Sequence, residues 1–158
     1  MIDYFDNCAT TRIDDDVQQI VDTYAKETYY NPSARSTFSL NVSTKLNQAR
    51  EQIAKSVGAD TEEIYFTSGG TESDNIAIFG SAKPKSGNIV TTASEHSAVY
   101  NAVMQLAGKG YEVRLGNVTP DGHIDVEDFL SKVDEHTVLA CFMHVNNENR
   151  RYKRRKDY

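Results

Sequence analysis

A turn built around Gly69 and Gly70 is the segment whose residue types best suit chemistry. It follows an apolar run at residues 64–66 and precedes a helical pattern that opens with Thr71. Glycine lets the backbone approach an anion closely, and the N–H groups and dipole of the following helix favour a phosphate group. A plain strand-to-helix turn capped by Thr71 is the alternative on spacing alone. The turn is neither a Walker A loop nor a G-x-G-x-x-G dinucleotide motif.

Two further groups of polar residues lie near the predicted ends of strands. His96 follows a predicted strand at residues 88–92, and an imidazole can stack on a ring or transfer protons near neutral pH. Asn146 and Asn147 follow an apolar run, at the carboxyl end where α/β sheets hold ligands. The simpler interpretations are a histidine at a helix start that is solvated by water, and asparagines that form a turn.

These residues require a framework in which strands and helices alternate. Hydrophobic periodicity predicts helices at residues 14–29, 43–57, 71–79, 95–107 and 125–133. Short apolar runs predict strands at residues 63–67, 88–92, 111–115 and 137–143, of which the last suits a buried position. The alternation indicates an α/β fold with a mostly parallel sheet flanked by helices.

Composition and the N-terminal residues limit the class of protein. No apolar run approaches the roughly 20 residues of a membrane helix. The N-terminus has neither the basic start nor the apolar core of a signal peptide, which predicts a cytoplasmic protein with no membrane partner. Cys8 and Cys141 lie far apart in the sequence, so neither a disulfide nor a metal site is expected from them.

Charge divides the chain near its end. The whole sequence has a formal net charge of -6. Residues 1–148 carry a net charge of -11, whereas residues 149–158 contain six basic side chains and one acidic side chain. Such a tail is either a solvated or nucleic-acid-binding extension, or a sequence foreign to the domain before it.

Five segments, in sequence order, resemble the motifs of cysteine desulfurases, which are class V members of the fold-type I enzymes that use pyridoxal phosphate. The segments are Tyr-Phe-Asp-Asn-Cys-Ala-Thr-Thr at residues 4–11, Asn-Pro-Ser-Ala at 31–34, Thr-Ser-Gly-Gly-Thr-Glu-Ser-Asp-Asn at 67–75, Glu-His-Ser-Ala-Val at 95–99 and His-Val-Asn-Asn-Glu at 144–148. The resemblance implies that residues 1–148 form an incomplete large domain of the fold type I transferase fold.

The resemblance also implies a role for individual residues. Gly70 and Thr71 would form part of the site for the phosphate of pyridoxal phosphate. His96 would stack on the cofactor ring and act in catalysis. Asn147 would hydrogen-bond the phenolic oxygen of the ring, with Asn146 as the alternative. Cys8 stands where the family usually has alanine, and a small packing residue is a simpler role for it than a sulfur carrier.

The implied reaction converts L-cysteine to L-alanine and leaves sulfur as a persulfide on the enzyme. The family supplies this sulfur to iron–sulfur cluster assembly or tRNA thiolation, as homodimers that serve sulfur-acceptor proteins. A selenocysteine lyase or another class V relative is one alternative. A phosphate- or nucleic-acid-binding module without catalysis is the other, although we do not expect nucleic acid as the partner.

The resemblance ends after Glu148. Family members usually continue with Thr-Gly-x-Ile, whereas this chain continues with Asn-Arg-Arg-Tyr-Lys-Arg-Arg-Lys. With a suitable choice of codons, one inserted base accounts for the change, so we hypothesise a frameshift or a sequencing error. The chain then divides into a partial domain at residues 1–148 and a tail at residues 149–158. The family's cofactor-binding lysine and persulfide cysteine lie downstream, so we expect no desulfurase activity from these residues alone.

Overall fold

A computed structural model describes residues 3–82 and 87–147. The chain divides into two compact units, residues 1–66 and residues 67–158. Each unit is described by itself below. No helix within the described residues is both long enough and apolar enough to cross a membrane.

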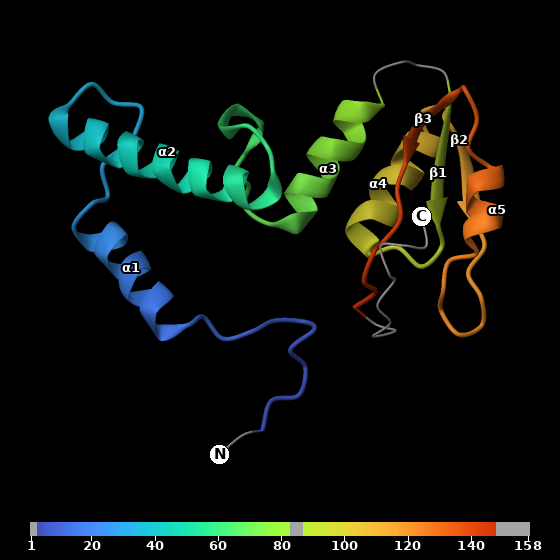
Figure 1. Cartoon of the computed structure of the whole chain (residues 1–158), viewed down its shortest axis with the longest axis horizontal. Coiled ribbons are helices and arrows are strands. Elements are labelled where there is room, and N and C mark those ends of the chain that lie inside the picture. The colour runs from blue at the N-terminus through green and yellow to red at the C-terminus, as the bar shows by residue number, and fades with distance from the viewer. Residues whose placement is uncertain (1–2, 83–86, 148–158) are drawn as a thin grey trace. The chain divides into compact units, whose positions relative to one another are not determined.

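The first unit is helical (Figure 1). Its elements are helix α1 (Asp15–Lys26), helix α2 (Thr37–Val57) and the 3₁₀ turn η1 (Thr61–Glu63). Helix α2 begins six residues before the predicted start, because the Ser36 side chain caps it by accepting the Ser39 N–H. Gly58 ends α2 as predicted, in the left-handed conformation with φ 71°.

The apolar face predicted for the first helix is present but exposed. Val17, Ile20, Val21 and Tyr24 are between 37% and 59% exposed, and α1 has no buried residue. Helices in proteins owe most of their stability to packing of an apolar face. Helix α1 therefore depends mainly on local contacts, such as the Asp14 carboxylate that accepts the Asp16 N–H.

The predicted strand at residues 63–67 is wrong. Glu63 ends η1, and residues 64–67 form no regular element, although the backbone at Ile64 is extended. A strand needs a neighbour to complete its ladder of hydrogen bonds. Here the Ile64 carbonyl accepts the Arg50 Nε–H at 3.1 Å, so a side chain takes the place of a neighbouring strand.

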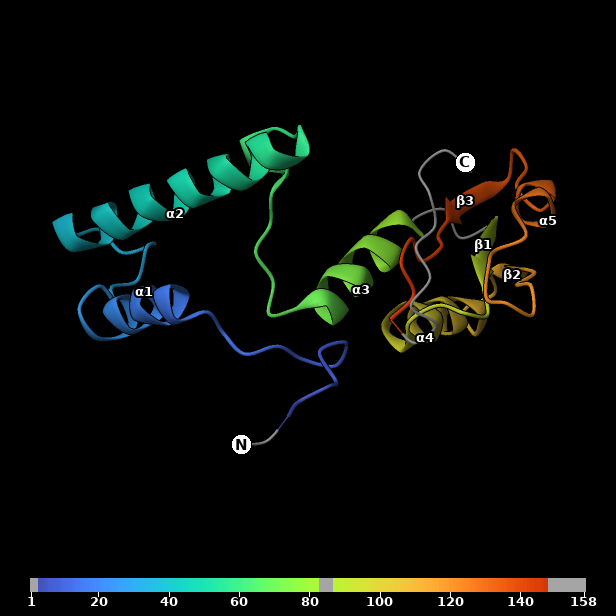
Figure 2. The same cartoon turned by 60° about the horizontal axis from the view of Figure 1, so that its bottom comes forward.

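The second unit has the predicted α/β architecture (Figure 2). Its elements are α3 (Gly70–Ser81), β1 (Asn88–Thr92), α4 (Ser97–Ala107), β2 (Glu112–Gly116), α5 (Val126–Ser131) and β3 (Thr137–Ala140). The strands form a parallel sheet in the order β2-β1-β3. The central strand β1 has the predicted bounds, and every residue in it is buried.

Helices cover both faces of this sheet. Ile89 packs into a cluster with Ile78 of α3 and with Val103 and other residues of α4. The next residue, Val90, points to the opposite face and packs with Ile124 and with Phe129 of α5. The core is therefore built around β1, and its carboxyl end is held from both sides.

The last predicted strand is shorter and less buried than expected. Strand β3 ends at Ala140 rather than at residue 143, and its residues are half-buried or exposed. It lies at an edge of the sheet described here, next to β1 alone. Beyond Cys141, the segment leaves the ladder, and the Met143 N–H donates to the Glu95 carboxylate instead of to β1.

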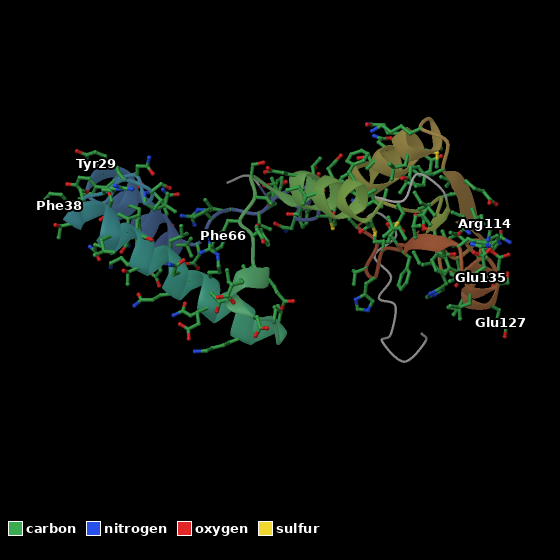
Figure 3. The ribbon with its side chains drawn as sticks, turned by 90° about the horizontal axis from the view of Figure 1, so that it is seen from above. Tyr29, Phe38, Phe66, Arg114, Glu127 and Glu135 are labelled. Carbon is green, nitrogen blue, oxygen red and sulfur yellow. The ribbon has the colours of Figure 1, made fainter. Side chains whose placement is uncertain are left out.

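A polar network joins the amino ends of β1 and β3 to Arg114 in the middle of β2. The buried Asn88 donates its amide N–H to the Asp134 carboxylate at 2.8 Å and accepts the Thr137 hydroxyl at 2.8 Å. Arg114 donates to the other oxygen of Asp134 at 2.6 Å. Figure 3 labels Arg114 and Glu135, the turn residue that follows Asp134, at the same end of the second unit. Hydrogen bonds from Arg114 and then Asn88 hold the pKa of Asp134 well below its ordinary value.

This depressed pKa predicts that the second unit loses stability in acid. The network stabilises the folded state fully only above the unfolded pKa of about 3.9. We expect the thermal midpoint to fall as the pH is lowered through this value toward the folded pKa. Asp134→Asn should lower the midpoint at neutral pH and flatten its dependence between about pH 5 and 3. Circular dichroism melts measure both effects, with the exposed Glu127→Gln as the control. An unchanged acid dependence in D134N contradicts the prediction.

Candidate functional site

The glycine turn before α3 is fixed by side chains on either side of it. The Glu72 carboxylate accepts the Ser68 N–H at 2.6 Å and the Ser68 hydroxyl at 2.7 Å. These two bonds lower the pKa of Glu72. The Thr67 hydroxyl lies 3.1 Å from the Gly69 carbonyl oxygen and donates to it. The turn thus has a defined shape before any ligand binds.

The first turn of α3 leaves room and donors for an anion. Gly69 occupies the cap position and provides no side-chain hydrogen bond, so the predicted alternative with Thr71 as the cap is wrong. Apart from chain neighbours and the helix's own backbone, no heavy atom of the described residues lies within 4 Å of a Cβ added at Gly69 or Gly70. Thr71 is the second residue of the helix and is exposed. The opening N–H groups of a helix have no partner within it, which suits a phosphate group.

His96 stands at the start of α4 and caps it. Its Nδ1 accepts the Ala98 N–H at 3.1 Å. Nδ1 therefore carries no proton, and the proton of the neutral ring lies on Nε2. The side chain is exposed, which leaves the ring face and the Nε2–H available to a ligand. His96 thus has a structural role as the cap of α4, whereas its predicted contact with a cofactor ring stays a prediction.

The structure separates the two asparagines that the sequence could not distinguish. Asn146 is 5% exposed, and its side-chain amide donates to the Ser94 carbonyl at 2.9 Å. Its role is to attach the segment after β3 to the loop after β1. Asn147 is more exposed, so of the pair it is better placed to meet a ligand.

The two cysteines occupy different environments. Cys8 is exposed in the first unit. Cys141 follows β3 and packs against the core, and burial raises the pKa of its thiol. A thiol with a raised pKa is a poor nucleophile at neutral pH, because the thiolate is the reactive form. Cys141 therefore serves packing rather than nucleophilic catalysis.

The site residues of the second unit gather at one end of the sheet. The helix α4 leads from the carboxyl end of β1 to the amino end of β2, so His96 lies at the carboxyl ends of the strands. The Tyr111 hydroxyl bonds the Ala82 carbonyl at 2.5 Å, which places the last turn of α3 near the amino ends. Helix α3 consequently runs in the direction opposite to β1 and begins on the side where the strands end, as Figure 1 shows.

The order of the strands gives a reason for a ligand site at this end. The chain passes from β1 to β2 on one side and then returns to β3 on the other side of β1. Open α/β sheets bind ligands outside the carboxyl ends at such a reversal of strand order. The residues on this side include the glycine turn of α3, the imidazole of His96 and the side-chain amide of Asn147. This donor set fits a phosphorylated aromatic cofactor such as pyridoxal phosphate.

Glu72 and Glu95 are site residues that sequence reasoning missed. Both carboxylates accept backbone N–H groups that shape the loops of the site. Ser68 and Glu72 are four residues apart, one more than in a capping box, so no standard helix-start pattern indicated their contact. The partner of Glu95 is Met143, 48 residues away, so no local pattern could have indicated it.

Comparison with known proteins identifies the family of this chain. Residues 3–149 match the family model described as Aminotransferase class-V. A cysteine desulfurase from Nostoc sp. (strain PCC 7120) is 41% identical over 147 residues, which cover 92% of this chain and 37% of that protein. The chain thus spans little more than a third of this curated relative.

Solved structures show the same likeness. A NifS-like protein superimposes with a TM-score of 0.89 and 36% identity, over 94% of this chain and 42% of that one. A structure described as SspA in complex with cysteine gives a TM-score of 0.85 and 32% identity, over 92% of this chain and 43% of that one. The resemblance inferred from the five motifs is confirmed, and the chain belongs to the aminotransferase class-V family.

Proposed function

We propose that this chain provides the phosphate- and ring-binding part of a pyridoxal-phosphate-dependent cysteine desulfurase. In the overall reaction, L-cysteine and an enzyme thiol give L-alanine and an enzyme persulfide. The observation that supports the proposal is that the α3 turn, His96 and the segment of Asn147 lie on the side of the sheet where the strands end. Similarity to curated cysteine desulfurases supports the choice of substrate.

Different residues of this chain bind the phosphate, the ring and the phenolic oxygen of the cofactor. Pyridoxal phosphate, when bound, supplies the electron sink for bond cleavage in the amino acid. The N–H groups of Gly70 and Thr71, with the Thr71 hydroxyl, hold the phosphate. The ring of His96 stacks on the pyridine ring, and its Nε2 can move a proton. The side-chain amide of Asn147 donates to the phenolic oxygen.

The wider setting of this function follows the family. We propose L-cysteine as the substrate, a homodimer as the working assembly, and sulfur-acceptor proteins as its partners in the cytoplasm. The structure titled SspA in complex with cysteine contains that amino acid. A selenocysteine lyase requires the same contacts to the phosphate and the ring of the cofactor, so these contacts do not distinguish the two enzymes. Turnover assays with L-cysteine and L-selenocysteine distinguish these two substrates, and they require a chain that also contains the family's lysine and persulfide cysteine.

We further propose that residues 1–148 are a partial family domain and that residues 149–158 result from a shifted reading frame. Both Glu148 and the tail lie outside the described residues. DNA sequencing across the Glu148 codon tests this point, and an alternative frame that encodes the family continuation is the expected finding. Because the family's lysine and persulfide cysteine are not assigned in this chain, we expect cofactor binding without alanine formation.

A substitution at His96 tests the proposed ring contact. His96→Asn keeps an acceptor that can cap α4 but removes the ring. We expect the affinity for pyridoxine phosphate to fall about three- to tenfold, as for the loss of one aromatic stacking contact. This ligand has an alcohol in place of the aldehyde, so it cannot condense with surface lysines.

Equilibrium dialysis gives the affinities, and the exposed His136→Ala provides the control. The proposal fails if the unaltered chain binds pyridoxine phosphate no better than inorganic phosphate. Displacement of the ligand by nucleic acid, in a manner that depends on residues 149–158, favours the binding-module alternative.

A further inference from the structure

The backbone ladder between β1 and the segment after β3 ends at Val90 and Cys141. The Cys141 N–H donates to the Val90 carbonyl at 2.9 Å, so the ladder extends one residue past β3. A regular parallel ladder next places the Met143 N–H on the Thr92 carbonyl. The Met143 N–H instead donates to Glu95 Oε1 at 2.7 Å. A side-chain carboxylate therefore replaces a strand carbonyl where β1 turns toward α4.

Glu95 has a second contact that fixes its own position. Its Oε1 accepts the hydroxyl of Thr92, which is fully buried, at 3.0 Å. The carboxylate is thus held by the last residue of β1 while it holds the segment after β3. The Asn146 amide provides another link between the same two segments through the Ser94 carbonyl. Of these two links, only the one through Glu95 contains a charged group, and hydrogen bonds to charged groups are the stronger kind.

We propose that Glu95 is a positioning residue that holds the loop carrying His96 against the segment carrying Asn147. His96 directly follows Glu95, and Asn147 lies four residues beyond Met143. The consequence for ligand binding rests on the proposed function, whereas the link itself does not. Groups that contact a ligand must be held within about 0.5 Å of their productive positions, so loss of the link weakens contacts to the ring.

Two variants of the full chain separate the link from the fold. Glu95→Gln keeps a carbonyl oxygen that can accept both hydrogen bonds, whereas Glu95→Ala removes the acceptor. In the ligand-free chain, E95A should speed hydrogen exchange at the Met143 amide about tenfold or more, the size expected for one bond to a charged acceptor. E95Q should restore most of the protection. The amides of Ile89 and Val103 in the core serve as the folding control in the same NMR experiment.

Binding measurements test the consequence for the site. E95A should lower the affinity for pyridoxine phosphate about tenfold and leave that for inorganic phosphate unchanged, because the α3 turn is fixed by Glu72. Unchanged hydrogen exchange at the Met143 amide in E95A overturns the proposal. Faster exchange with an unchanged affinity for pyridoxine phosphate also overturns it. If the unaltered chain binds no pyridoxine phosphate, the proposed function fails. The exchange at Met143 then decides alone whether Glu95 links the two segments.

Discussion

Gly70→Asp is expected to abolish phosphate binding at the α3 turn while the fold is kept. Gly70 has a helical backbone and open space around an added side chain, so the substitution should cause no clash. A carboxylate there lies where the ligand phosphate is proposed to bind. At an effective dielectric constant of about 20, two unit charges about 4 Å apart repel by about 4 kcal/mol. We therefore expect the affinity for pyridoxine phosphate to fall at least about a hundredfold.

Gly70→Asp should weaken ligand binding without lowering the stability of the fold, so the two effects can be told apart. An acidic residue in the first turn of a helix stabilises it by about 0.3–1 kcal/mol, so G70D should melt no lower than the unaltered chain. Gly80 lies near the other end of α3 and also has open space around an added Cβ, which makes Gly80→Asp the matched control. There the same charge meets the negative end of the helix dipole and lowers stability slightly. We expect G80D to bind the ligand normally.

Pyridoxine without its phosphate provides a further control for the same pair. Because G70D acts on the phosphate alone, its affinity for pyridoxine should match that of the unaltered chain. Calorimetric titration measures both ligands on both variants. Equal losses for pyridoxine and pyridoxine phosphate, or equal losses in G70D and G80D, would show that the phosphate does not bind at this turn.

The sequence predicted best the elements that depend on their own residues. The predicted bounds of β1 were correct because turn residues limit this short run on both sides. Such a run is typical of a buried strand at the centre of a parallel sheet. Gly58 was correctly placed at the end of α2, since only its backbone conformation mattered. The first turn of α3 was likewise predicted from its glycines. These features need no knowledge of distant partners.

Features set by distant partners could not be predicted. Residues 64–67 have the composition of a strand, yet a strand exists only where a neighbour completes its ladder. The length of β3 depends on where β1 turns away and on the Glu95 carboxylate that then accepts the Met143 N–H. Asn146 and Asn147 are identical in type, and only burial and the Ser94 contact separate them. Histidine is not a preferred helix cap, so the contact from His96 to Ala98 was not expected either.

Gly87→Ala is expected to destabilise the second unit strongly, because it combines backbone strain with a clash. Gly87 precedes β1 and has φ 135°, a conformation that residues with a Cβ rarely adopt. A Cβ at this position would lie 2.7 Å from the His136 carbonyl oxygen and 2.7 Å from Val138 Cγ1. The carbonyl cannot easily move, because it accepts the Asn88 N–H at 3.1 Å. Strain and clash together should cost about 2–5 kcal/mol.

Gly110→Ala separates the two causes. Gly110 has φ 99°, and apart from chain neighbours no heavy atom of the described residues lies within 4 Å of an added Cβ. It should cost only the backbone strain, about 1–2 kcal/mol. Urea unfolding followed by circular dichroism measures both variants, and equal losses would show that the clash at Gly87 is absent.

The position of Gly87 also distinguishes loss of fold from loss of site. It lies at the amino end of β1, opposite the end where the ligand residues gather. Any loss of pyridoxine phosphate binding in G87A should therefore follow the unfolded fraction and disappear when conditions restore folding. G70D should show the reverse, with binding lost in a folded chain. The two variants thus distinguish the stability of the sheet from ligand binding, because G87A should lower the stability and G70D should lower the ligand affinity alone.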